Sequence, residues 1–203
     1  MLGRFDEARP VLIEFFRVLE ERGDVVNLGQ YLSMSATQFE LLAGDTAAAV
    51  KYGERGCHLL EEAGERGFLA TGLCIFAQAL YAHDRLTEAD ACAERGIELA
   101  DADDTSAQMD SRRVRAKVLA RRGRYEEAEA LSREAVAIAD TTEGLRGQGD
   151  TRADLAEVLE LAGRRDEASA SLRDALERYE RKEALVLARR TREQLASLEE
   201  TPM

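Results

Sequence analysis

The stretch GRYEEAEALSREAVAIAD, residues 123–140, decides the fold because its pattern occurs five times along the chain. Its opening hexapeptide has these counterparts: GRFDEA at 3–8, GDTAAA at 44–49, DRLTEA at 84–89, GRYEEA at 123–128 and GRRDEA at 163–168. Successive copies begin 41, 40, 39 and 40 residues apart. A regular period of this length is typical of repeat proteins, in which each unit packs against the next.

Each hexapeptide predicts a turn between two helices. Four copies begin with glycine, which adopts a positive φ without a Cβ clash, and the third begins with Asp84, the next best tolerated type. The acidic residues that follow favour the positive end of a new helix. Apolar residues then recur at helical spacing, as in Ala128, Leu131, Ala135 and Ile138.

Small residues mark the line along which the two helices of a unit should cross. The position seven residues after the conserved alanine of the hexapeptide reads Phe15, Gly56, Gly96, Ala135 and Ala175. Glycine inside a helix costs roughly 1 kcal/mol relative to alanine, so another helix is expected to pass too close for a Cβ. Seven residues before each turn the chain again has small residues: Thr37, Ala77, Ala116 and Ala156. Each unit is therefore predicted to be an antiparallel hairpin of two helices.

The repeat predicts an all-α fold of about ten helices, a right-handed α–α superhelix of stacked hairpins that forms a single solenoid over residues 1–203. Its expected divisions are a half repeat at 1–23, full repeats at 24–64, 65–102, 103–141 and 142–181, and a capping helix at 182–199. Because the chain opens on a turn, the first hairpin lacks one helix, which should leave Leu12, Phe15, Phe16 and Leu19 with few neighbours. Either the chain is a fragment of a longer protein or this apolar face is an assembly surface that could form a homodimer.

The pattern G-x-[YF]-x-E-A, with small residues at the alanine and seven positions later, resembles the second half of a tetratricopeptide repeat of the long-helix variety. The stretches VRAKVLARRGRYEEAEALSREAVAIAD and RADLAEVLELAGRRDEA also resemble the C-terminal arrays of actinobacterial cyclase/ATPase proteins and LuxR-type regulators. Asp84 and Arg165 depart from the usual turn Gly and aromatic residue. The resemblance implies a non-catalytic scaffold that binds a protein or peptide segment, or a neighbouring domain of the same parent chain.

In such repeats the first helix of each hairpin lines the concave surface. The resemblance therefore implies a binding groove lined by Tyr31, Met34, Gln38, Thr71, Cys74, Gln78, Tyr81, Arg113, Lys117, Arg121 and Glu157. The three basic residues share one helix face because they are four residues apart. One interpretation is a cradle for a carboxylate or an acidic segment. The other is that their charges pair with Glu157 and its neighbours on the next helix.

The composition argues against several other classes of function. A net charge of −12 disfavours nucleic-acid binding. The sequence has no catalytic constellation, no metal motif and no nucleotide loop, so we expect no catalytic residue, no cofactor and no metal. Cys57, Cys74 and Cys92 are interpreted as buried thiols of a cytoplasmic protein. The uncharged run at 68–82 is too short to span a membrane.

Three hypotheses remain. The first is an interaction module in a larger bacterial signalling protein, of the cyclase/ATPase or transcriptional-regulator type. The second is a sensor that binds a peptide or small ligand in the groove. The third is a self-assembly element.

Overall fold

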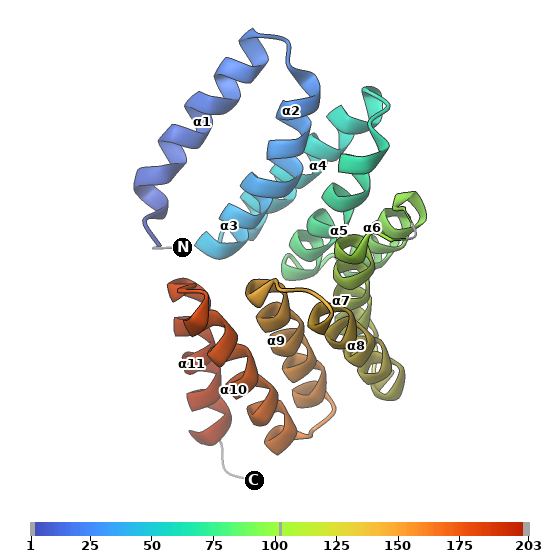
Figure 1. The fold of residues 1–203 in the computed structure, drawn as a ribbon, viewed down its shortest axis with the longest axis vertical. Helices are drawn as coiled ribbons and strands as arrows, with labels where there is room; N and C mark the ends of the chain where they lie inside the picture. Colours follow the sequence, from blue (N-terminus) through green and yellow to red (C-terminus); the bar gives the residue numbers. More distant parts are fainter. Residues whose placement is uncertain (1–2, 102, 201–203) are drawn as a thin grey trace. The chain divides into compact units, whose positions relative to one another are not determined.

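The computed structural model describes residues 3–101 and 103–200, and within these ranges every regular element is a helix (Figure 1). The helices are α1 (Phe5–Glu21), α2 (Val25–Gln30), the π-helical turn η1 (Tyr31–Ala36), α3 (Thr37–Ala43), α4 (Thr46–Glu62), α5 (Arg66–Ala82), α6 (Leu86–Leu99), α7 (Thr105–Arg121), α8 (Tyr125–Asp140), α9 (Leu145–Leu161), α10 (Arg165–Arg181) and α11 (Leu185–Glu200).

The segments α2, η1 and α3 follow one another without a break and form one helical rod. Counted in this way, the described residues form ten rods that stack in consecutive pairs. The predicted all-α architecture of paired helices is confirmed. The chain divides into two compact units, residues 4–114 and residues 115–200, which are described separately below. The assignment of residues 1–203 to a single solenoid stays a prediction.

The predicted turns lie where the hexapeptides begin. Gly44, Gly123 and Gly163 have φ values of 88°, 78° and 79°, in the left-handed region that favours glycine. Asp84 takes the same conformation with φ of 62°, which a short polar side chain tolerates better than most. Each of these residues ends one helix and allows the next to run back along it.

In four of the five hexapeptides, an arginine and a glutamate form an ion pair at the start of the second helix of the hairpin. In α1, α6, α8 and α10 the N-cap residue is an arginine without a side-chain capping bond. Its Nε instead donates to the glutamate three residues later, in the pairs Arg4–Glu7, Arg85–Glu88, Arg124–Glu127 and Arg164–Glu167, at 2.7 to 2.8 Å. These bonds hold the pKa of Glu88, Glu127 and Glu167 below the usual value. The α4 copy uses a conventional cap, in which Asp45 accepts from the Ala48 amide at 2.9 Å.

The glycines of the crossing line lie against backbone, as the sequence predicts. A Cβ at Gly56 of α4 would be 2.3 Å from the Ser33 amide nitrogen and 2.7 Å from the Gly29 carbonyl oxygen. A Cβ at Gly96 of α6 would be 3.0 Å from the Ala70 carbonyl oxygen and 2.6 Å from Cys74 Sγ. All of these distances are shorter than van der Waals contact, so only glycine allows these helices to approach so closely.

The N-terminal hairpin has a better core than the sequence suggested. Phe16 and Leu19 of α1, expected to have few neighbours, are only 6% and 8% exposed because they pack on Leu28 and Leu32 of the next rod. Phe15 is 37% exposed, in agreement with the expectation. Helix α1 therefore buries the side that faces α2 and leaves other apolar residues at the surface.

Alanines at the crossing line of α8 should not tolerate a larger side chain. Ala128 and Ala135 are 0% and 1% exposed, whereas Ala137 on the same helix is exposed. We expect Ala135→Leu to lower the free energy of unfolding by about 1–3 kcal/mol through overpacking, and Ala137→Leu to change it little. Chemical denaturation of both variants measures the difference. Equal stabilities would contradict the close pairing of α8 with its hairpin partner.

Candidate interaction face

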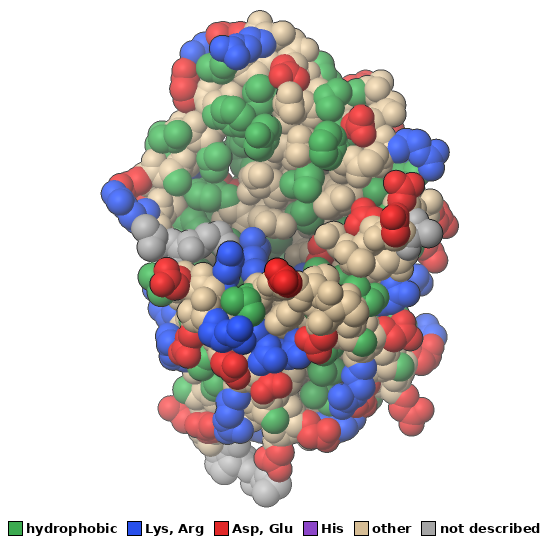
Figure 2. All heavy atoms as spheres, viewed as in Figure 1, with side chains coloured by type: hydrophobic (Ala, Val, Ile, Leu, Met, Phe, Trp, Pro, Cys, Tyr) green, Lys and Arg blue, Asp and Glu red, His purple; other side chains and the backbone are tan. Residues whose placement is uncertain are grey.

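The candidate site lies on residues 4–114 and consists of uncharged side chains that follow the first helix of two successive hairpins. We call it the A-helix face. Its members are Tyr31, Met34 and Gln38 of the rod formed by α2, η1 and α3, then Phe68, Thr71 and Gln78 of α5, and Phe15, which reaches the face from α1. Thr71 and Gln78 occupy the positions in their repeat that Tyr31 and Gln38 occupy in theirs. Figure 2 shows hydrophobic side chains gathered over α1, α2 and α3, with few charged side chains among them.

An exposed aromatic pair is the most distinctive feature of this face. The rings of Phe15 and Tyr31 meet edge to face, with centroids 4.9 Å apart and planes at 87°. Phe15 is 37% exposed to solvent and Tyr31 is 38% exposed. Aromatic residues in this position dominate the energetics of interfaces when a partner covers them. Sequence reasoning missed Phe15 as a site residue, although its size is anomalous in a column that is otherwise glycine or alanine.

The π-helical turn η1 coincides with the aromatic pair. It begins at Tyr31, and the hydroxyl of Thr37 donates to the Leu32 carbonyl oxygen at 2.9 Å, five residues earlier in the chain. Gly56 presses against this turn at the backbone of Ser33. Single π-helical turns inside α-helices are rare and occur frequently at functional sites. The turn therefore marks the same part of the molecule as the exposed rings.

The rods that carry the face are almost free of charge. Residues 25–43 contain one charged side chain, Glu40, which is 2% exposed. Arg9 of α1 donates to both of its carboxylate oxygens, at 3.0 Å from Nε and 2.7 Å from Nη2. Residues 66–82 contain only Arg66, at the first position of α5. A partner that covers this face need not desolvate a charged group of the face itself.

Two residues expected in the groove are buried in the core. Cys74 is 0% exposed, and its thiol donates to the Ala107 carbonyl oxygen at 3.8 Å. Tyr81 is 8% exposed. The placement of both residues on an open face is wrong because α5 is covered by its neighbours over most of its circumference. Of the predicted members from the α2–η1–α3 rod and α5, five remain accessible, since Tyr31 is exposed and Met34, Gln38, Thr71 and Gln78 are half-buried.

The basic residues of α7 are paired within the structure. Arg113 is 8% exposed, and its Nη1 donates to Asp110 at 2.7 Å. Lys117 is 9% exposed, and its ammonium lies 2.9 Å from Asp154 and 3.9 Å from Glu157. This geometry favours the interpretation in which the charges pair with the neighbouring helix, although they are buried rather than solvated. Arg121 is exposed at the end of α7.

The three thiols should be poorly reactive in the folded protein. Burial raises the pKa of the Cys57 thiol to about 12 and raises the pKa of the Cys74 and Cys92 thiols as well, while Cys92 alone of the three is half-buried rather than buried. Because only the thiolate reacts, we expect dithionitrobenzoate at pH 8 to modify Cys92 first and Cys57 and Cys74 only as the protein unfolds. In denaturant all three should react at once. Three fast thiols in the native protein would contradict this prediction.

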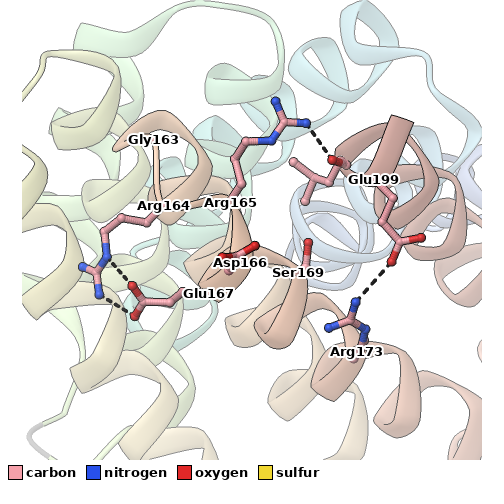
Figure 3. Close-up of a pocket in the computed structure, with 9 residues that line it drawn as sticks. Gly163, Arg164, Arg165, Asp166, Glu167, Ser169, Arg173 and Glu199 are labelled. Atoms are coloured by element: carbon pink, nitrogen blue, oxygen red, sulfur yellow. Dashed lines mark hydrogen bonds and ion pairs between the residues drawn. The ribbon is translucent and has the colours of Figure 1, made fainter. Parts of the chain in front are cut away.

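A separate hollow of about 790 Å³ lies within residues 115–200, between the start of α10 and the end of α11 (Figure 3). Arg165 Nη2 donates to the Leu198 carbonyl oxygen at 2.6 Å, and Arg173 lies 3.1 Å from Glu199. The arginines around the hollow therefore already have acceptors, and a ligand would have to compete with them. This makes the hollow a weaker candidate than the A-helix face.

Residues 106–181 match the family model of the tetratricopeptide repeat. The chain has a tetratricopeptide-like repeat fold. The crystal structure of BtubC (BKLC) from P. vanneervenii is similar, with a TM-score of 0.58 and 13% sequence identity over 97% of this chain and 89% of that protein. A protein of Podosopora anserina described as a kinesin light chain with nearly identical TPR-like repeats has a TM-score of 0.49 and 16% identity, over 91% of this chain and 100% of its own.

No curated protein sequence matches the chain. Tetratricopeptide repeats are in general protein–protein interaction modules, and their partners are typically proteins or peptides. Within residues 3–101 and 103–200, no group of three or more His, Cys, Asp or Glu side chains is arranged to hold a metal ion. Among the same residues, no helix is long and apolar enough to cross a bilayer.

Proposed function

We propose that this chain is a non-catalytic interaction module that docks a protein segment on the A-helix face of residues 4–114. The observation that carries this proposal is the exposed Phe15–Tyr31 pair on an uncharged surface. A segment that covers both rings would remove apolar surface from water, at roughly 25 cal/mol per Å². Gln78, which is half-buried on α5, would supply an amide donor and acceptor for the backbone of the docked segment.

Selection from a random library of displayed dodecapeptides tests the proposal. We expect peptides enriched on the full chain to lose at least about tenfold in affinity when Phe15 and Tyr31 are both replaced by serine, because hot-spot aromatic residues carry most of the binding energy. Tyr125→Ser is the matched control, since Tyr125 is 42% exposed on the other unit. Enriched peptides that bind the double variant as tightly as the unchanged protein would refute the proposal.

We further propose that the module is cytoplasmic and belongs to a larger bacterial signalling protein, of the cyclase/ATPase or transcriptional-regulator type. The support for this context is the resemblance of residues 114–140 and 152–168 to the arrays of such proteins. The free thiols are consistent with a reducing compartment. Sequencing the surrounding gene tests it, because a cyclase or ATPase segment in the same reading frame is expected.

Self-assembly is a second candidate function, favoured by the exposure of α1. Val11 and Ile13 are 68% and 53% exposed, although other residues of the same helix pack on the α2–η1–α3 rod and on Tyr52 of α4. If this surface joins two copies, the mass in solution should be that of a dimer and should fall to that of a monomer in Val11→Asp. A monomer at all concentrations would leave docking as the function. Binding of a small ligand in the groove, the sensor alternative, would appear as a concentration-dependent rise in Tm.

A further inference from the structure

Acidic groups are distributed unevenly between the two units. Residues 4–114 contain 21 Asp and Glu against 11 Lys and Arg, a net charge of −10, whereas residues 115–203 contain 19 against 17, a net charge of −2. The uncharged A-helix face thus belongs to the more negative unit. Charge concentrated around a neutral surface steers oppositely charged partners to it.

Carboxylates, here called the acidic border, gather where the N-terminal end of α5 meets the C-terminal end of α6. A hollow of about 370 Å³ is lined there by Arg66, Gly67, Ala70, Glu98, Leu99, Ala100, Asp101 and Asp104. Three of these residues are acidic and one is basic. Phe68, which is 38% exposed, lies next to Gly67 on the first turn of α5. The acidic hollow therefore reaches the turn of α5 that also carries Phe68.

The basic residues of α7 that were interpreted as a binding site for a carboxylate do not offer an acidic partner an alternative site. Arg113 and Lys117 are buried against Asp110, Asp154 and Glu157. An acidic partner would have to compete with these carboxylates, and at the A-helix face it would meet repulsion from the surrounding unit.

We propose that the segment docked on the A-helix face is basic. In this arrangement its apolar anchor side chains cover Phe15, Tyr31 and Met34. Its Lys or Arg side chains lie toward Glu98, Asp101 and Asp104. The inference rests on the proposed function and specifies the chemistry of the partner. Complementary charge raises the association rate and the specificity, while the apolar anchors provide most of the affinity.

The peptides selected from the dodecapeptide library provide the first test. We expect them to be rich in aromatic or aliphatic residues and to carry a net positive charge. One enriched peptide is then synthesised in two forms with the same anchors, one with its basic residues kept and one with each replaced by glutamate. The basic form should bind at least about tenfold more tightly at low ionic strength, and the difference should shrink as the Debye length falls to about 3 Å near 1 M salt.

Variants that neutralise the acidic border distinguish its effect on the association rate from the effect of the other charges of the unit. Glu98→Gln combined with Asp101→Asn should reduce the association rate of the basic peptide severalfold and leave that of the glutamate form unchanged or faster. Glu54→Gln combined with Glu62→Gln removes two exposed carboxylates of the same unit outside the hollow and is the matched control.

The outcomes distinguish the two proposals. If the glutamate form binds as well as the basic form, and binding is still lost in the Phe15 and Tyr31 double variant, the inference about charge is overturned and the docking function stands. If no peptide is enriched, or if enriched peptides ignore the double variant, the docking function itself fails. If the basic form binds more tightly and the border variants reduce its association rate, the inference is supported.

Discussion

Replacement of Gly56 by alanine is expected to lower the free energy of unfolding by about 2 kcal/mol, although alanine is the better helix former. The added Cβ would lie 2.3 Å from the Ser33 amide nitrogen and 2.7 Å from the Gly29 carbonyl oxygen. These atoms belong to backbone and cannot rotate away, so α4 and η1 must separate. Overpacking of this kind costs typically 1–3 kcal/mol, occasionally more, and the gain of about 1 kcal/mol in helix propensity offsets only part of it.

A second glycine in the same unit provides the matched control. Gly67 lies in the first turn of α5, and a Cβ there would meet only the Glu65 carboxylate oxygen at 3.5 Å. Gly67→Ala should therefore be neutral or stabilise the protein by up to about 1 kcal/mol. Urea denaturation of the two variants gives the comparison. If Gly56→Ala were as stable as Gly67→Ala, the backbone contact between α4 and η1 could not be present in solution.

Gly56 also connects packing to the candidate site. Because it presses on Ser33, it fixes the rod at the turn from which Tyr31 projects. Gly56→Ala should then weaken peptide binding even where the protein remains folded, whereas Gly67→Ala should not. A variant with reduced stability and unchanged affinity would show that the position of Tyr31 does not depend on this crossing.

The repeat made much of the fold predictable. The turn residues and the crossing-line glycines each have a local chemical reason, namely a positive φ or a missing Cβ, and such reasons can be recognised in a sequence. The π-helical turn could not be recognised, because it arises where α4 meets the rod and the letters YLSMSA give no sign of it. Its consequence, the exposed pair Phe15 and Tyr31, depends on a contact between two different helices.

The groove assignment failed where the helical stripe is ambiguous. Residues 67–82 of α5 are uncharged throughout, so periodicity does not show which side faces solvent, and Cys74 and Tyr81 were placed on the wrong side. The partners of Lys117 were only partly predictable. Glu157 was expected from repeat register, but the closer Asp154 lies three residues before it on the same helix.

Replacement of Asp154 by alanine is expected to cost about 3 kcal/mol. Its carboxylate lies 2.9 Å from the Lys117 ammonium, and the two side chains are 13% and 11% exposed. Removing one member of a buried ion pair leaves the other charge in a medium of low dielectric constant, which costs more than the pair contributes. Lys117→Met should be destabilising for the same reason. The double variant Lys117→Met/Asp154→Leu should recover most of the loss, because both charges are then absent.

An exposed pair in the same unit shows what a solvated interaction is worth. Arg173 and Glu199 are 3.1 Å apart but 60% and 61% exposed, so Glu199→Ala should change stability by no more than about 0.5 kcal/mol. The double-mutant cycle at Lys117 and Asp154, measured by chemical denaturation, should give a coupling several times larger. Equal losses in Asp154→Ala and Glu199→Ala would mean that Lys117 is hydrated like a surface residue. The Lys117 charge would then be available to an acidic partner. The proposal of a basic partner would lose the support that it draws from the pairing of Lys117 with Asp154 and Glu157.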